Sequence, residues 1–300
     1  MARALPVLLM QQPGLVGDDW AQRFETDLRA RMVEFPRSLL VVYPELHLCP
    51  PATADAAERS AEPMDGPRMK LLQKLAADLN IWLVPGSVFE RDSDGRIYNT
   101  AVAIAPDGDV VARYRKCFPW RPFENVAAGS EFVVFDIPGV TTIGVSICYD
   151  TWFPEVARHL AWMGAEVILQ PTRTHTVDRA QELVLSQATA ITNQVFVISV
   201  NAAAPAAAGQ SLIVDPEGRV LVQAGATSVP LTNVLVLDAV DVVRDFGTAG
   251  ITRVWSQFQP NDPPIPLPLY GGAFHPRRWT PARPHTHPGG TALEDPAPSG

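Results

Sequence analysis

The stretch TTIGVSICYDTWFPE, residues 141–155, joins an apolar run to a cysteine and then to an aromatic, acidic turn. The run that ends at Cys148 is apolar enough to form a buried strand, and the proline at 154 favours a helix start. The chain holds three cysteines, Cys49, Cys117 and Cys148. Cys148 is therefore either a small buried hydrophobe or a thiol presented for chemistry at a strand end.

Outward from this stretch, segments with helical spacing alternate with apolar strands. The helix-like segments are 18–35, 67–80, 154–165 and 178–194. The strand-like segments are 4–12, 39–45, 81–90, 131–139, 141–150, 166–172, 195–203 and 232–241. Two further segments read as hairpins around Pro-Asp-Gly-Asp and Pro-Glu-Gly, at 97–116 and 210–225. This order predicts a layered α/β fold with mixed sheets.

Composition predicts one globular domain followed by an arm. The chain has 300 residues, of which 47% are hydrophobic, so it can bury a large core as a single domain. We expect this domain to span residues 1–258. The segment 259–300 is dense in Pro and Gly and shows no period, which predicts an extended arm with a disordered end.

Net charge limits the kinds of partner expected, and cysteine usage indicates the expected cellular compartment. The net charge of -8 argues against nucleic acid or an anionic membrane as the main partner. No apolar run reaches the roughly 18 residues of a membrane helix, and the N-terminus reads as a strand instead of a signal peptide. The odd cysteine count favours a reduced, cytoplasmic protein, and no spacing typical of a metal site is present.

Three apolar strands run into reactive side chains, namely Glu45, Lys116 and Cys148. Strand ends in α/β folds converge on ligand sites, so these side chains can share a pocket. A nearby ammonium favours a thiolate, a carboxylate can take the thiol proton, and a thiolate attacks acyl carbon. Each residue also has an ordinary explanation: a core cysteine, a surface or capping glutamate, and a solvated lysine.

These motifs resemble the nitrilase superfamily of carbon–nitrogen hydrolases, which carry a Glu-Lys-Cys triad in this chain order. The resemblance covers residues 4 to about 245 and implies a four-layer α-β-β-α sandwich. It also implies roles: Cys148 is the nucleophile, Glu45 the general base and acid, and Lys116 a stabiliser of the tetrahedral intermediate. The N–H of Tyr149 would be a second oxyanion donor.

The lysine loop, YRKCFPWRPFENVAAG, is similar to that of the aliphatic amidase and formamidase branch. By this similarity Glu124 is an additional glutamate of the site, and Trp120 lines it. The alternative for Glu124 is a surface loop acid. Tyr149 stands where that branch tends to carry an acid, so the substrate need not be a very small aliphatic amide.

The pair Tyr149-Asp150 after the cysteine resembles amidases and carbamoylases more than nitrilases. We therefore predict an enzyme that hydrolyses a small amide through a cysteine thioester and releases ammonia, with no cofactor. The alternatives are an N-carbamoyl amino acid amidohydrolase, a nitrilase, a catalytically idle scaffold of the same fold, and a thiol redox protein.

The loop QPTRTHT, residues 170–176, follows a strand and is expected to line the pocket. Within it, Thr172 and Arg173 are candidates for substrate contact, and either Arg173 or His175 could meet a substrate carboxylate; an exposed loop or a subunit contact is the alternative. Further aromatic walls are expected from Tyr149 and Trp152. The family resemblance also predicts a homodimer or higher homo-oligomer.

Overall fold

The computed structural model describes residues 3–49, 55–257, 261–263 and 265. The residues up to Gln257 form one compact unit. The predicted boundary at 258 and the arm at 259–300 lie outside the described residues, apart from 261–263 and 265. In the part of the chain that is described, no helix is both long and apolar enough to cross a membrane.

The described residues form two sheets. In the first, β1 lies next to the edge strand β13, with which it pairs antiparallel, and pairs parallel with β2 on its other side. Its strand order is β13 (Val229–Val236), β1 (Ala4–Gln11), β2 (Leu40–Val42), β3 (Trp82–Val84), β5 (Ile97–Ile104) and β4 (Ser87–Arg91), and β6 (Val110–Arg115) also pairs with β5.

The second sheet is parallel at its centre, where β9 pairs with β8 and β10, and antiparallel at both edges. Its strand order is β12 (Val220–Gln223), β11 (Leu212–Val214), β10 (Phe196–Asn201), β9 (Val167–Thr172), β8 (Thr141–Val145) and β7 (Val133–Ile137).

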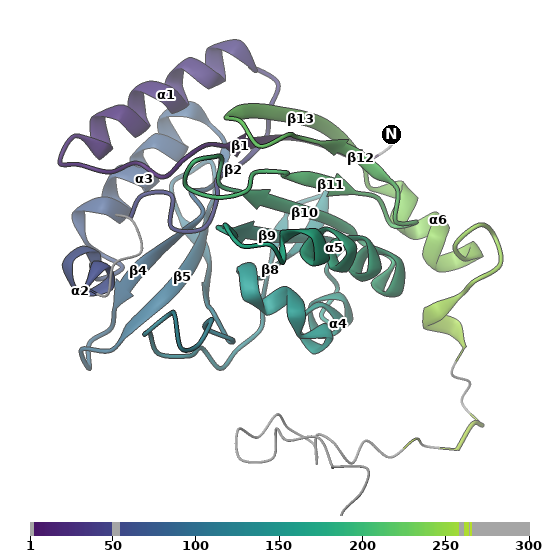
Figure 1. The fold of residues 1–300 in the computed structure, drawn as a ribbon. Coiled ribbons are helices and arrows are strands. Elements are labelled where there is room, and N and C mark those ends of the chain that lie inside the picture. The colour runs from purple at the N-terminus through teal and green to yellow at the C-terminus, as the bar shows by residue number, and fades with distance from the viewer. Residues whose placement is uncertain (1–2, 50–54, 258–260, 264, 266–300) are drawn as a thin grey trace, which may run out of the picture. The chain divides into compact units, whose positions relative to one another are not determined.

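Two helices cover the outer face of each sheet (Figure 1). Helices α1 (Trp20–Glu34) and α3 (Pro67–Leu79) pack on the first sheet through a cluster that includes Phe24 and Leu72. Helices α4 (Pro154–Trp162) and α5 (Arg179–Asn193) pack on the second through a cluster that includes Leu160. A third cluster lies between the sheets. This confirms the predicted four-layer α-β-β-α arrangement.

The strand expected at 141–150 ends at Val145, before the short 3₁₀ helix Cys148–Trp152. Two more segments differ from the strands expected at 81–90 and 232–241. The first divides into β3 and β4 at Gly86, which has φ +85°. A Cβ atom there would lie 1.7 Å from the carbonyl oxygen of Pro44, so only glycine lets this turn approach the loop after β2. The end of the second segment is helix α6 (Asp238–Phe246), whose acidic first turn and buried Val240 and Val243 suit a surface helix. A short helix, α2 (Ala56–Ser60), was also not expected.

Candidate active site

Three chain segments deliver the three predicted reactive side chains to one place. Glu45 follows β2, Lys116 comes directly after β6, and Cys148 opens a short 3₁₀ helix, η1 (Cys148–Trp152), after β8. Glu45 and Lys116 are 5% and 2% exposed, respectively, which is rare for charged side chains unless they are paired.

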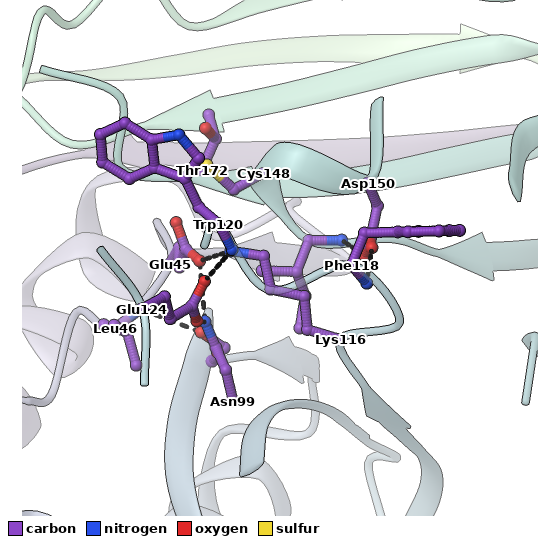
Figure 2. Close-up of polar contacts among 12 residues, drawn as sticks. Glu45, Leu46, Asn99, Lys116, Phe118, Trp120, Glu124, Cys148, Asp150 and Thr172 are labelled. Carbon is purple, nitrogen blue, oxygen red and sulfur yellow. Dashed lines mark hydrogen bonds and ion pairs between the residues drawn. The ribbon is translucent and has the colours of Figure 1, made fainter. Parts of the chain in front are cut away.

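Lys116 binds two carboxylates at once (Figure 2). Its Nζ donates to Oε1 of Glu45 at 2.9 Å and to Oε2 of Glu124 at 2.7 Å. Glu124 is held in turn by the backbone N–H of Trp120, which donates to Oε2 at 2.9 Å. The lysine loop therefore folds back so that the glutamate eight positions along meets the lysine.

Asn99, in β5, closes a ring around these groups. Its Nδ2 donates to Oε1 of Glu45 at 2.8 Å and to Oε1 of Glu124 at 2.7 Å. Its backbone carbonyl also accepts the N–H of Lys116 at 2.8 Å. One amide and one ammonium thus hold both carboxylates, and Asn99 itself is fully buried. Hydrogen bonds to charged acceptors of this kind are among the stronger ones in proteins.

The charges in this ring shift the pKa values of Lys116 and Glu124 in opposite directions. Burial alone would lower the pKa of Lys116, but the charges of Glu45 and Glu124 raise it well above its ordinary value. Burial would raise the pKa of Glu124, but Lys116, the Trp120 N–H and Asn99 outweigh it and the pKa is lowered. Lys116 is consequently a permanent cation and Glu124 a carboxylate.

The turn at Cys148 is held by Asp150. Cys148 has φ +46°, in the left-handed region that costs an L-residue about 1–2 kcal/mol. The carboxylate of Asp150 accepts the N–H of Ile147 at 2.9 Å, the N–H of Phe118 at 2.9 Å and the hydroxyl of Tyr114 at 2.7 Å. Burial raises its pKa to about 6, against the charge of Lys116 and these donors. The buried side chain thereby ties the nucleophile turn to the lysine strand and loop.

The surroundings of the thiol favour its neutral form. Burial raises the pKa of Cys148 far above its ordinary value, the charge of Glu45 raises it further, and Lys116 lowers it by less. The nearby ammonium favours the thiolate, as the motifs suggested, but burial and the charge of Glu45 outweigh it. The sulfur lies 3.7 Å from Oγ1 of Thr174.

The chain that forms this site is similar to known proteins. Residues 27–237 match the family model described as carbon-nitrogen hydrolase. The chain belongs to the carbon–nitrogen hydrolase family. The resemblance to the nitrilase superfamily drawn from the motifs is thereby confirmed.

Two kinds of relative illustrate the match. The chain is 31% identical over 222 residues to omega-amidase NIT2-A of Xenopus laevis, covering 69% of this chain and 79% of that protein. It superposes on Nit3 of Saccharomyces cerevisiae, described as a member of branch 10 of the nitrilase superfamily, with a TM-score of 0.74, 28% identity and coverage of 81% and 94%.

A third relative is the amidase of Nesterenkonia sp. AN1. One of its mutants shows covalent addition of the acetamide moiety of fluoroacetamide at the active-site cysteine. That structure matches this carbon–nitrogen hydrolase with a TM-score of 0.71, 25% identity and coverage of 81% and 95%.

The remaining candidates of this carbon–nitrogen hydrolase lie around the same ring. Thr172 ends β9, is fully buried, and its carbonyl accepts the N–H of Glu45 at 3.3 Å. Arg173 is partly exposed and directs its backbone N–H to the sulfur of Cys148, and its Nη1 is buried without a hydrogen-bond partner among the described residues. Thr172 thus supports the site, and Arg173 borders the nucleophile.

The predicted aromatic residues divide between loop and helix. Trp120 packs on Phe123 with ring centroids 4.4 Å apart. Tyr149, in the first turn of η1, is partly exposed and lies 6.4 Å from the ring of Trp152, which is 36% exposed. Trp120 alone of the three is tied by a backbone hydrogen bond to the carboxylate ring.

Several residues of the site were not among the sequence candidates: Asn99, Asp150, Thr174 and Glu182. The available signals were weak. Asn99 is a polar residue inside an apolar strand, and such a residue needs buried partners. Asp150 follows the nucleophile directly. Glu182 lies on α5 and resembles any helical glutamate until the fold buries it to 2% exposure. Within the described residues, no cluster of His, Cys, Asp and Glu has the form of a metal site.

Proposed function

We propose that this carbon–nitrogen hydrolase cleaves the amide bond of a small linear carboxamide through a thioester on Cys148 and releases ammonia. The observation that carries the proposal is the buried ring in which Lys116 holds Glu45 and Glu124, next to the cysteine turn. A scaffold gains no stability from burying three ionised groups, whereas acyl transfer uses all of them.

In the first half of the reaction, Glu45 takes the proton of the Cys148 thiol as the sulfur attacks the amide carbon. The neutral resting thiol makes this proton transfer part of the attack. The ammonium of Lys116 and the N–H of Tyr149 stabilise the oxyanion that forms on the carbonyl oxygen. The protonated Glu45 then gives its proton to the leaving nitrogen, and ammonia departs.

In the second half, water enters the place left by ammonia. Glu45, again a carboxylate, removes a proton from this water as it attacks the thioester carbon. The oxyanion is stabilised as before, and its collapse releases the carboxylic acid and returns the Cys148 thiol. Glu124 keeps Lys116 and Asn99 in place through both halves, because it binds both of them.

The substrate we favour is an amide that also carries a carboxylate. Supporting this, curated relatives include omega-amidases, and Arg173, whose backbone N–H faces the Cys148 sulfur, has a buried Nη1 with no hydrogen-bond partner among the described residues. A guanidinium binds a carboxylate through paired hydrogen bonds. N-carbamoyl amino acids carry the same charge and are the alternative substrate class. The pairing of two copies stays a prediction that size-exclusion chromatography with light scattering can check.

The test is ammonia release from ω-amides of dicarboxylic acids, short aliphatic amides, formamide, N-carbamoyl amino acids, aromatic amides and matching nitriles. Cys148→Ala should abolish release from every active compound, while Cys49→Ala, which removes a buried thiol of the hydrophobic cluster around Leu46, should retain it. Arg173→Gln should raise KM for the carboxylate-bearing amides about tenfold and leave neutral amides unchanged. Turnover by Cys148→Ala, or no turnover of any amide by folded protein, would contradict the proposal.

A further inference from the structure

A second series of hydrogen bonds reaches Cys148 from the side of α5. The sulfur lies 3.7 Å from Oγ1 of Thr174, and this hydroxyl donates to Oε1 of Glu182 at 2.9 Å. Thr174 is itself fixed at both backbone groups by Asn201, whose Oδ1 accepts its N–H at 2.9 Å and whose Nδ2 donates to its carbonyl at 3.0 Å. The thiol is thus connected to a carboxylate that takes no part in the mechanism above.

The hydroxyl of Thr174 has one proton to donate and two lone pairs to accept with. Its proton goes to Glu182. Its oxygen also lies 2.9 Å from Oγ1 of Thr172 and 3.7 Å from the sulfur of Cys148. With the single proton committed to Glu182, Thr174 can only accept from these two neighbours. The bond to Cys148 is consequently S–H to oxygen, which requires a neutral thiol.

Arg179, which lies on the same helix, forms an ion pair with Glu182 and opposes the rise in the pKa of Glu182 that burial causes. Nη1 of Arg179 lies 3.1 Å from Oε2 of Glu182, and both side chains are at most 3% exposed. Nη1 also donates to the hydroxyl of Ser199 at 3.3 Å, and Nη2 to the carbonyl of Gln210 at 2.8 Å. The other charged groups that face the thiol are Glu45 after β2 and Lys116 after β6.

We propose that Thr174 and Glu182 form a relay that holds the resting nucleophile as a neutral thiol, with the Cys148 S–H donated to Oγ1 of Thr174. The proposal rests on the proposed function, in which Cys148 is the nucleophile. Thr174 touches the reacting sulfur, whereas Glu182 is a positioning residue that acts through Thr174. The relay points the thiol proton away from Glu45 until a substrate turns the sulfur toward its carbonyl carbon.

The test measures the rate at which methyl methanethiosulfonate modifies Cys148 between pH 7 and 11, followed by peptide mass. In Glu182→Gln, a negative charge is removed and the Thr174 hydroxyl is free to donate to a thiolate. We expect the midpoint of the pH profile to fall by at least one unit and the rate at pH 7.5 to rise about tenfold. An unchanged midpoint would overturn the proposal.

A double-mutant cycle separates the relay from a plain charge effect. In a Thr174→Val background, Glu182→Gln can act only through its charge, so the fall in midpoint should be less than half that seen in the wild type. If Glu182→Gln shifts the midpoint equally in the two backgrounds, Thr174 does not transmit the effect of Glu182, and the proposal is overturned.

Thr174→Val and Thr174→Ser test the same idea with the ion pair of Glu182 and Arg179 intact. Thr174→Val removes the acceptor of the S–H and should lower the midpoint, whereas Thr174→Ser should keep the wild-type profile. A midpoint that stays or rises in Thr174→Val overturns the proposal even if Glu182→Gln does not fold. Modification of buried Cys49 reports unfolding in every variant. Because this readout needs no substrate, it is independent of ammonia release, which tests the proposed function.

Discussion

Replacing Asn99 by leucine tests whether the ring around Lys116 sets the acidic limit of activity. The side chains are similar in size, but leucine offers no N–H to Glu45 or Glu124. The replacement therefore removes the two hydrogen bonds of 2.8 and 2.7 Å while the core volume is nearly kept. Lys116 still holds both carboxylates, so the site should stay assembled at high pH.

The magnitude follows from the bond to Glu124. A hydrogen bond to a charged group contributes about 1.5–3 kcal/mol, and a shift of one pKa unit corresponds to 1.36 kcal/mol. Losing the Asn99 bond should raise the lowered pKa of Glu124 by about 1–2 units. Glu124 is needed as a carboxylate, so activity is lost as the pH falls through its pKa. A higher pKa therefore means that this loss begins at a higher pH. The acidic limb of the kcat/KM profile should move up by about 1–2 pH units.

The assay is ammonia release from the best amide between pH 4.5 and 9, with folding monitored by circular dichroism. Thr100→Val is the matched control, because Thr100 is the next residue of β5, is equally buried, and donates its hydroxyl to Glu90 at 2.7 Å, away from the ring. It should leave the acidic limb in place. A uniform loss of activity in Asn99→Leu, with an unmoved limb, or the same movement in Thr100→Val, would refute the reasoning.

Three further predictions follow from buried groups. Asp150→Asn should lower kcat at least tenfold and the unfolding free energy by about 1–3 kcal/mol, because the new amide N–H would face the backbone N–H of Ile147. Steady-state kinetics measures the loss in kcat, and urea unfolding measures the loss in stability. His47 has its pKa lowered to about 3 by burial and by Arg173, so the folded state loses stability as pH falls below 6.5. The stability lost between pH 7.5 and 5.0 in urea should therefore be about 2 kcal/mol smaller in His47→Phe, and equal losses would contradict this. Gly86→Ala should lower the free energy of unfolding by about 3 kcal/mol or more and reduce activity. Gly95 has a similar φ but open surroundings, so Gly95→Ala should lower it by about 1 kcal/mol, and thermal unfolding of the two variants compares them.

Local patterns predicted a layered α/β fold, and the resemblance to a known family supplied the four layers and the roles of the reactive groups. Buried strands read as continuous apolar runs, and the helices between them have their own spacing, so the alternation was visible without the structure. Glu45, Lys116 and Cys148 each stand where such a run ends. The tail of the last predicted strand was different, because residues 238–241 belong to helix α6, whose Val240 packs in the core.

The supporting residues were not predictable in the same way, because their partners lie far along the chain. Asn99 is 54 residues from Glu45 and 25 from Glu124, and its amide has no local signal for either. Glu182 pairs with Arg179 at a spacing that is ordinary on exposed helices. Its contact with Thr174 exists because the loop after β9 meets α5. Long-range contacts of this kind come from topology, and only the folded chain displays them.

The balance of charge explains why the thiol waits in its neutral form. Glu45 and Glu124 share one cation, so the ring carries one excess negative charge, while Glu182 is balanced by Arg179. A thiolate would add a second negative charge, and two unit charges 4 Å apart interact by about 4 kcal/mol at an effective dielectric constant of 20. Moving the proton from Cys148 to Glu45 leaves the total unchanged. In the proposed mechanism, attack is therefore coupled to that transfer, and the burial of the thiol beside Glu45 is what favours the coupling.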